Sequence, residues 1–579
     1  MPMNKKEAEK YYKMAIELEQ LNATFNYALM LQFGDGIPAN KKEAANLYKT
    51  AADKGQVNAM FNYALMLFYG DGIPVNKKEA IRYYLMAIEH GHPGAMFNYA
   101  LMLYKGDGIS VNKKEAAKYF KMAADKGMAN AMFNYASMLY SGDGVTTDLA
   151  EVARYFKMAA DKGHIISMYN YAVMASNGEG IPVNKKEAAK YYKMAIDKGE
   201  LNAMVNFGNM LVKGEGVSSN KKEALKYYKS AAEKGDVNAM FNYGLALYDG
   251  IGVNSDKKEA AKYFKNAADK GSKAAMYNYG VMLSHGEGVP LDKKEGAKYI
   301  KMAADQGPIQ AIYNYGLLLF NGDGVSMNKK EAQRYYRLSA DKGYIDAMYS
   351  YALMLYDGDG IPQDKKEAAK YFKMAADKGQ VNAMFNYALM LFNGDGIPED
   401  KKEAFRYFKM ASDGGDSHAM HNCGIMLYNG FGIPQDQKEA YRYFKQSSDN
   451  GCLESTYKLG LFNYHGRGTP VNKKDAASYF KKTADKGTMN AMFNYAVMSF
   501  NGEGIPQDKK EAEKYYKMGI EKGQVNSMFN YALMLFSGDG TNMDKKEAAR
   551  HFKMAADKGH LNAMYNYAML LFTGEGISQ

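Results

Sequence analysis

Residues 364–399 read DKKEAAKYFKMAADKGQVNAMFNYALMLFNGDGIPE, and this stretch decides the fold. Close copies of it recur every 36 residues along the 579-residue chain. The sixteen copies begin at Asn4, Asn40, Asn76, Asn112, Asp148, Asn184, Asn220, Asp256, Asp292, Asn328, Asp364, Asp400, Asp436, Asn472, Asp508 and Asp544. A fixed period of this length is typical of a solenoid, in which each repeat buries its apolar side chains against its neighbours. We therefore expect residues 1–579 to form one array, with no linker or appended domain.

The first half of the repeat predicts an amphipathic helix. Asp364 and Glu367 have the spacing of a capping box, in which the cap side chain accepts a backbone N–H and the Glu reaches back to the cap. One helical stripe then collects Ala368, Tyr371, Phe372, Ala375 and Ala376. Lysines occupy the opposite face. Gly379 is expected to end the helix, because glycine adopts the left-handed conformation at little cost.

The second half predicts a shorter and more apolar helix. Asn382 is the expected cap, and residues 383–392 are apolar nearly all round apart from Asn386. Such a helix must be covered on most sides. Gly394-Asp395-Gly396 then turns the chain, and Pro398 prevents a helix before the next cap. Short connections of this kind produce antiparallel helix pairs that stack on one another.

A family resemblance follows from these two halves. Residues 365–379, KKEAAKYFKMAADKG, and residues 383–400, AMFNYALMLFNGDGIPED, resemble the Sel1-like repeat, a 36-residue relative of the tetratricopeptide repeat. The resemblance covers the whole chain. It implies an all-α fold, a right-handed α/α superhelical solenoid of sixteen two-helix repeats whose second helices line the concave side. It also implies a role as an adaptor or scaffold in protein complexes.

A stripe of asparagines on the second helix is the most distinctive candidate for partner binding. Only Ser350 and Lys458 break it. The stripe comprises Asn26, Asn62, Asn98, Asn134, Asn170, Asn206, Asn242, Asn278, Asn314, Asn386, Asn422, Asn494, Asn530 and Asn566. A ladder of amides could hold the backbone of an extended peptide. In the simpler interpretation each amide bonds to the neighbouring repeat, because a polar group among apolar residues needs a partner.

Two further positions are expected on the same face as the asparagines. Four residues after the Asn a methionine recurs, Met390 in the quoted repeat, and core filling is the preferred interpretation for most of these methionines. The position seven residues after the Asn varies strongly and could provide selectivity. It reads Phe33, Tyr69, Lys105, Ser141, Asn177, Lys213, Asp249, His285, Asn321, Asp357, Asn393, Asn429, His465, Asn501, Ser537 and Thr573.

Charge gives little support to a polyanionic partner. The net charge is +11, from 75 Lys and Arg against 64 Asp and Glu, which is less than one charge per repeat. The lysines of the first helix could attract nucleic acid or an anionic membrane, but acidic residues are interleaved with them. We expect a protein or peptide partner, and neither nucleic acid nor a small-molecule substrate.

The repeats that begin at Asp400 and Asp436 depart furthest from the pattern. They contain His418, His421, Cys423, Cys452 and His465. A zinc site would need four converging ligands, so drifted repeats with a free buried cysteine are the simpler interpretation. The same region carries Phe431, Lys458, Phe462 and Arg467 at otherwise regular positions, which could mark a local binding site or a change in curvature.

The remaining expectations concern activity, location and the chain ends. No nucleophile, base and orienting group stand out from the repeated background, so we expect no enzyme activity and no cofactor. No apolar stretch approaches the roughly 18 residues of a membrane span, and no signal peptide is recognisable, so a cytoplasmic protein is expected. Both ends look like cuts between repeats, which indicates either a piece of a longer array or head-to-tail self-association. The expected function is a protein-interaction scaffold that binds an extended peptide or a partner helix.

Overall fold

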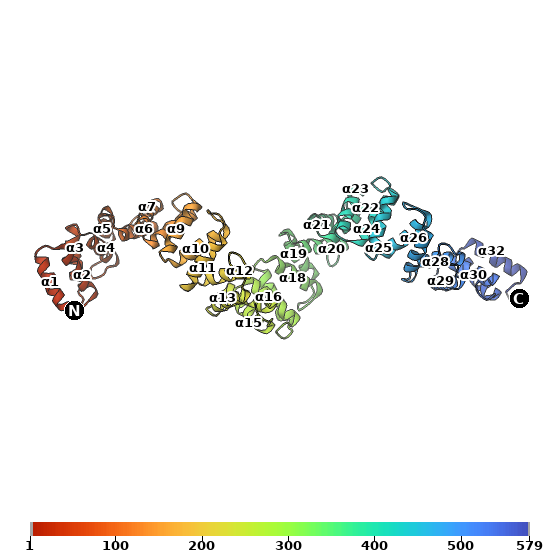
Figure 1. Cartoon of the computed structure of the whole chain (residues 1–579), viewed down its shortest axis with the longest axis horizontal. Helices are drawn as coiled ribbons and strands as arrows, with labels where there is room; N and C mark the ends of the chain where they lie inside the picture. The colour runs from red at the N-terminus through yellow and green to blue at the C-terminus, as the bar shows by residue number, and fades with distance from the viewer. Residues whose placement is uncertain (1–3, 577–579) are drawn as a thin grey trace. The chain divides into compact units, whose positions relative to one another are not determined.

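The computed structural model describes residues 4–576, and these residues form thirty-two α-helices and no strand. The chain divides into two compact bodies, an N-terminal body up to Asp292 and a C-terminal body from Lys293 onward, which are treated separately below. Within each body every helix packs against the next one in the chain (Figure 1). Helices two apart contact each other mainly through side chains, as Asn386 of α22 and Tyr349 of α20 do. This succession of neighbours is that of an α-solenoid, as predicted.

First and second helices of the repeat alternate along the chain. The N-terminal body contains α1 (Lys5–Glu17), α2 (Leu21–Phe33), α3 (Lys41–Asp53), α4 (Val57–Tyr69), α5 (Lys77–Glu89), α6 (Pro93–Lys105), α7 (Lys113–Asp125), α8 (Ala129–Ser141), α9 (Leu149–Asp161), α10 (Ile165–Asn177), α11 (Lys185–Asp197), α12 (Leu201–Lys213), α13 (Lys221–Glu233), α14 (Val237–Asp249), α15 (Lys257–Asp269) and α16 (Lys273–His285). The C-terminal body contains α17 (Lys293–Ala304), α18 (Ile309–Asn321), α19 (Lys329–Asp341), α20 (Ile345–Asp357), α21 (Lys365–Asp377), α22 (Val381–Asn393), α23 (Lys401–Asp413), α24 (Ser417–Asn429), α25 (Gln437–Asp449), α26 (Leu453–His465), α27 (Lys473–Ala484), α28 (Met489–Asn501), α29 (Lys509–Glu521), α30 (Val525–Ser537), α31 (Lys545–Asp557) and α32 (Leu561–Thr573).

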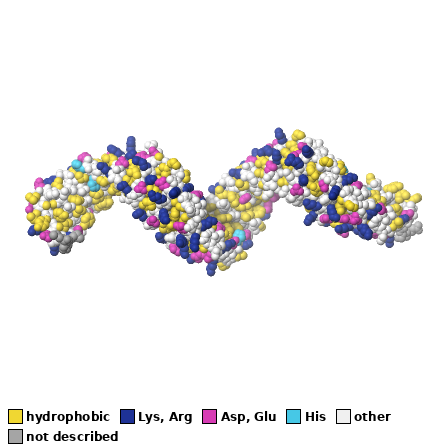
Figure 2. Space-filling view, in the orientation of Figure 1, with side chains coloured by type: hydrophobic (Ala, Val, Ile, Leu, Met, Phe, Trp, Pro, Cys, Tyr) yellow, Lys and Arg dark blue, Asp and Glu magenta, His cyan; other side chains and the backbone are white. Residues whose placement is uncertain are grey.

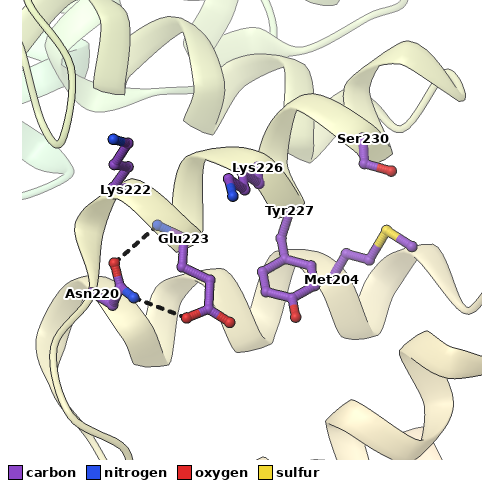
Figure 3. A pocket seen from close by; sticks show the side chains of 7 residues that line it. All are labelled: Met204, Asn220, Lys222, Glu223, Lys226, Tyr227 and Ser230. Atoms are coloured by element: carbon purple, nitrogen blue, oxygen red, sulfur yellow. Dashed lines mark hydrogen bonds between the residues drawn. The ribbon is translucent and has the colours of Figure 1, made fainter.

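The start of the first helix confirms the predicted cap. The carboxylate of Asp364 accepts the backbone N–H of Glu367 at 2.9 Å. The backbone N–H of Asp364 itself donates to the carbonyl of Leu355 on α20, 2.9 Å away, so the cap also ties the first helix to the helix before it. In five of the repeats whose cap is asparagine, the glutamate accepts from the cap side chain, as Asn220 Nδ2 and Glu223 Oε2 show at 2.9 Å (Figure 3). The glutamate thus reaches the side chain of the cap.

The second helix begins earlier than predicted. Gln380 caps α22, and its side-chain oxygen accepts the backbone N–H of Ala383 at 2.6 Å. Asn382, the expected cap, is instead an exposed residue in the first turn of α22. Glutamine is not among the usual cap residues, but its longer side chain still reaches the third backbone N–H of the helix. Both α21 and α22 contain 13 residues, so the expectation that the second helix is shorter was wrong.

The core lies between successive helices. The predicted stripe of α21 is buried along its whole length. On α22 the buried residues are Ala383, Met384, Ala388, Met390 and Leu391. Aromatic rings join neighbouring repeats, as in the edge-on contact of Tyr351 on α20 with Tyr371 on α21, whose centroids are 4.8 Å apart. Small alanines at the buried positions allow the helices to approach closely.

Glycines with positive φ follow both helices, and two of them differ in what surrounds them. Gly379 after α21 has a φ of 97° and Gly396 in the turn after α22 has a φ of 78°, so both lie in the left-handed region. A Cβ atom at Gly379 would meet nothing within 4 Å. A Cβ atom at Gly396 would overlap Lys365 at the start of α21. Gly396 therefore allows both the positive φ of the turn and the close contact between the turn and the first helix.

The exterior carries both signs of charge. Figure 2 shows Lys and Arg side chains intermingled with Asp and Glu on the visible face. Many of them form ion pairs, such as Lys370 with Glu367 at 2.8 Å and Lys121 with Glu151 at 2.8 Å. None of the helices formed by residues 4–576 is both long enough and apolar enough to cross a membrane.

Candidate partner-binding surface

One row of side chains remains accessible on each second helix. In α22 it consists of Asn382, Asn386, Leu389 and Asn393, all of which are exposed or half-buried. Their spacings of four, three and four residues place them on one side of the helix. We call these residues and their equivalents in the other repeats the second-helix face.

The variable position belongs to this face, whereas the recurring methionine does not. All sixteen residues at the variable position, Asn393 in α22, are exposed. Met390 is only 2% exposed, which confirms that this methionine fills the core. The expectation that it shares the accessible face of Asn386 was therefore wrong. The accessible neighbour is Leu389, three residues after the asparagine, and its equivalent Leu533 is 40% exposed. Sequence reasoning missed this position, although an apolar residue recurs there in fourteen of the sixteen repeats.

Hollows recur at equivalent places on the second-helix face. One of about 240 Å³ lies between α4 and α6, one of about 280 Å³ between α8 and α10, and one of about 240 Å³ between α18 and α20. An aromatic ring from the intervening first helix lines each hollow, respectively Tyr84, Phe156 and Tyr336. An acidic residue of the following turn completes it, respectively Asp107, Glu179 and Asp359. The repeat thus produces similar small sites at two places in the N-terminal body and at one place in the C-terminal body.

Some amides of the asparagine stripe bond to tyrosines. Asn206 Nδ2 lies 3.3 Å from the hydroxyl oxygens of both Tyr169 and Tyr192. These tyrosines stand 37 and 14 residues before the asparagine, on the preceding second helix and on the first helix of the same repeat. Equivalent bonds are Asn98 to Tyr84 at 3.4 Å, Asn386 to Tyr349 at 3.3 Å, Asn494 to Tyr457 at 3.2 Å and Asn530 to Tyr516 at 3.2 Å. In these repeats the amide joins neighbouring helices.

Other members of the stripe have no such bond. Within residues 4–576 the side chains of Asn170, Asn278, Asn422 and Asn566 have no recorded hydrogen bond. In each case phenylalanine stands both 14 and 37 residues before the asparagine. For Asn170 these residues are Phe156 and Phe133, which offer no hydroxyl group. A tyrosine at one of these two positions is therefore needed for this bond, but it is not sufficient, because Tyr12 and Tyr228 stand 14 residues before Asn26 and Asn242 without such a bond.

The rest of the stripe is mixed. Asn134 also follows two phenylalanines, and its Nδ2 donates to the carbonyl of Asn130 in its own helix at 2.9 Å. Asn242 Nδ2 lies 3.4 Å from Asn209 Oδ1. Asn62 interacts with the hydroxyl of Tyr48, and Asn314 also has a partner. Asn26 has no recorded hydrogen bond within the described chain.

A ladder of ion pairs runs beside the second-helix face. In twelve repeats the first lysine of the first helix contacts the acid in the turn, as Lys365 and Asp395 do at 2.8 Å. The hydroxyl of Tyr356, from the preceding repeat, donates to the same carboxylate at 2.8 Å. Lys365 and Tyr356 together hold the pKa of Asp395 below its usual value. The four exceptions are Leu149 with Glu179, Lys221 with Ile251, Lys401 with Phe431, and Gln437 with Arg467.

The lysine-rich first helices carry a different kind of hollow. One of about 510 Å³ lies over α13 and is lined by Asn220, Lys222, Glu223, Lys226, Tyr227, Ser230 and Met204 (Figure 3). Its acid is already used, because Asn220 and Glu223 make both hydrogen bonds of the cap with each other. The asparagine and the glutamate of this hollow therefore serve the helix cap.

The divergent repeats contain a buried polar chain. Nδ1 of His421 lies 2.7 Å from the Ser455 hydroxyl, which donates to Ser447 at 2.7 Å, and Ser447 donates to the carbonyl of Ser417 at 2.7 Å. Burial raises the pKa of the Cys423 thiol, and both cysteines are free and buried. Among residues 4–576 no three His, Cys, Asp or Glu side chains are grouped to hold a metal ion. Ser447 and Ser455 stand where the repeat that begins at Asp364 has the alanines Ala375 and Ala383. This replacement of alanine by serine is visible in the sequence.

The comparisons with known proteins agree with this architecture. The model of the Sel1 repeat matches residues 2–19, 21–56, 57–92, 93–128, 129–164, 165–200, 201–236, 237–272, 273–308, 309–344, 345–380, 381–416, 417–452, 453–488, 490–524, 525–560 and 561–579. The chain therefore belongs to the Sel1-repeat family. The family register starts at the second helix, so it joins each second helix to the first helix that follows.

One solved structure supports the same fold, and a second is a weaker match. A protective antigen of uropathogenic Escherichia coli with an SLR fold has 23% identity and a TM-score of 0.58, and the alignment covers 78% of this chain and 93% of that one. A Sel1 repeat protein of Oxalobacter formigenes has 24% identity and a TM-score of 0.45, with 56% and 93% covered. A search among curated proteins found no match. Sel1 and tetratricopeptide-like repeat proteins generally mediate protein–protein interactions, and the Sel1 scaffold is generally non-catalytic.

Proposed function

We propose that this protein is a non-catalytic scaffold or adaptor that binds an extended peptide or a partner helix of another protein along the second-helix face. The recurrence of equivalent hollows on this face supports the proposal most directly. Each hollow combines an aromatic floor with a few polar groups, which is the usual composition of a recognition site. A ligand with side chains at regular intervals could use several hollows at once.

The asparagines contribute unequally to this proposed site. Asn170, Asn278 and Asn422 are half-buried and have no recorded hydrogen bond within the described chain, so their amides are available to a peptide backbone. Asn98, Asn206 and Asn530 already donate to tyrosine hydroxyls. Exposed residues at the variable position, such as Asn393, would distinguish one partner from another.

The proposal can be tested with two matched triple variants. A partner is first identified by affinity capture and mass spectrometry, and its affinity is then measured with purified proteins. Replacement of Asn170, Asn278 and Asn422 by alanine should weaken binding about tenfold or more, because each lost hydrogen bond contributes about 0.5–1.5 kcal/mol. The control replaces Asn98, Asn206 and Asn530 and should affect stability more than binding. Equal losses of affinity in the two variants would contradict the division of the asparagines into ligand-binding and structural members.

Self-association is a second candidate, and it rests on one observation. Helix α32 exposes a continuous apolar side, with Phe572 87% exposed and with Leu561 and Tyr565 also accessible. The equivalent residues of α30, Val525, Phe529 and Phe536, are half-buried. The next repeat covers these residues of α30, so the apolar side of α32 suits either a further repeat or a second copy of the array. Light scattering over a range of concentrations tests it, and a molar mass that stays at the monomer value would exclude it.

A further inference from the structure

The hollow between α8 and α10 differs from its equivalents in its charge. Elsewhere the turn acid is neutralised within the repeat, as Asp359 is by Lys329 and Asp107 is by Lys77. At the start of α9 Leu149 stands where fourteen of the sixteen repeats have lysine. Glu179 accordingly has no ion pair within residues 4–576. Its one recorded hydrogen bond comes from the exposed Asn177, whose Nδ2 lies 2.9 Å from the carboxylate.

The walls of this hollow suit a cation. They consist of Ser137, Tyr140, Phe156, Tyr169, Asn170, Val173, Met174 and Glu179. Glu179 is the only charged residue of the lining, and Tyr140 is 54% exposed. Aromatic faces attract Lys and Arg side chains, and a carboxylate beside them strengthens that attraction. The hollow therefore has a negative charge that the chain itself leaves unbalanced.

We propose that the hollow between α8 and α10 is a subsite for a lysine or arginine side chain of the bound polypeptide. The proposal rests on the proposed function, because it assumes that the partner lies on the second-helix face. Glu179 would pair with the cationic group, the rings of Tyr140 and Tyr169 would lie beside it, and the unbonded amide of Asn170 would bind the adjacent peptide backbone. A single carboxylate among aromatic residues does not provide the several oxygen ligands that a metal ion needs.

Methionine methyl groups provide a local measurement in the full chain. Met174 lines this hollow, and Met102 and Met354 line the equivalent hollows, so ¹³C-methyl methionine NMR can observe the three sites together. The signals are assigned with Met-to-Leu variants. The probes are the amides of N-acetyl-lysine, N-acetyl-arginine and N-acetyl-norleucine, which differ mainly in the charged group. The two cationic probes should shift the Met174 signal at concentrations about tenfold lower than the norleucine probe, as expected for a charge-assisted contact.

Two substitutions test the role of the Glu179 charge, one by removing the carboxylate and the other by neutralising it. E179Q removes the carboxylate and should weaken binding of the lysine probe at Met174 about tenfold. L149K introduces the lysine that most repeats have at this position and should have the same effect, because the new side chain would pair with Glu179. D107N in the hollow between α4 and α6 is the control and should leave the Met174 response unchanged. Unchanged circular dichroism would show that each variant is folded.

The outcomes separate this inference from the proposed function. Equal binding of the norleucine and lysine probes, or an E179Q variant that binds the lysine probe as well as the original protein, would overturn the subsite. A partner that crosslinks to the second-helix face but is insensitive to E179Q and L149K would overturn the subsite and leave the proposed function standing. Probe binding that follows Glu179 while no partner contacts this face would support the subsite and contradict the proposed function.

Discussion

Replacement of Asn206 by alanine is the most informative test of how the amide stripe is divided. Asn206 Nδ2 donates to two tyrosine hydroxyls at 3.3 Å, and one of them belongs to Tyr192, which is only 3% exposed. Burial raises the pKa of Tyr192 to about 12, against a smaller opposite effect of the bond from Asn206. The substitution removes both bonds and leaves a buried hydroxyl without this partner.

The magnitude follows from these contacts. Each neutral hydrogen bond contributes about 0.5–1.5 kcal/mol, and an unpaired buried group adds a desolvation cost, so we expect Asn206→Ala to cost about 2 kcal/mol. Asn170→Ala is the matched control, because phenylalanines occupy both aromatic positions around it. Its expected cost is about 0.5 kcal/mol or less.

Hydrogen exchange measured by mass spectrometry suits a repeat protein, in which stability is local. Asn206→Ala should lower protection in α11 and α12, and Asn170→Ala should leave α9 and α10 close to the original. The double variant Y192F/N206A should recover part of the loss, because no unpaired hydroxyl then remains at the buried position 192. Equal losses of protection in Asn206→Ala and Asn170→Ala would refute the division of the stripe into bonded and unbonded amides.

Three further predictions follow from the same structure. Nδ1 of His92 accepts the Ala95 N–H at 3.1 Å, and burial lowers the pKa of His92 below 6.5. Its contribution to stability is therefore complete above about pH 6.5 and is lost as the pH falls below that value. The variant H92Q, with the residue that Gln56 provides in the preceding repeat, should keep the cap and reduce the pH dependence of the urea midpoint; an unchanged dependence would count against this cap. Gly396→Ala should cost about 3 kcal/mol and Gly379→Ala about 1–2 kcal/mol in urea unfolding, because both have positive φ but only Gly396 lies against Lys365. Equal costs would show that the close contact is unimportant. Ser455→Ala should destabilise α25 and α26 by about 1–3 kcal/mol, because it leaves His421 and Ser447 without their shared partner, and unchanged hydrogen exchange there would contradict this.

The fold was largely predictable because the same helix-forming pattern occurs sixteen times in the sequence. The period, the buried stripe of the first helix and the glycine after it all depend on local spacing, which the sequence displays directly. The sequence predicted the cap of the second helix at Asn382, because asparagine is a common cap residue and Gln380, the observed cap two residues earlier, is an unusual one. A boundary of this kind depends on where a longer side chain can reach, and the pattern of residue types alone does not express it.

The candidate surface was predicted less completely. The exposed variable position was predicted correctly. Met390 was expected on the accessible face, but the structure places Leu389 there and buries Met390, since positions three and four residues after Asn386 are both its neighbours on a helix. The lack of a tyrosine bond at Asn170, Asn278, Asn422 and Asn566 follows from phenylalanine both 14 and 37 residues earlier. The choice between tyrosine and phenylalanine is visible in the sequence, but only the structure shows which of these rings lie beside each amide.

Site-specific photo-crosslinking tests the central claim most directly. A photoreactive phenylalanine analogue at Asn393 lies on the second-helix face of α22, and the same analogue at Lys373 lies on the exposed side of α21. Both variants keep the rest of the C-terminal body unchanged. With a partner identified by affinity capture and then purified, we predict crosslinks from position 393 and none above background from position 373. Crosslinks from position 373 alone would show that the partner binds the first helices and would contradict the account.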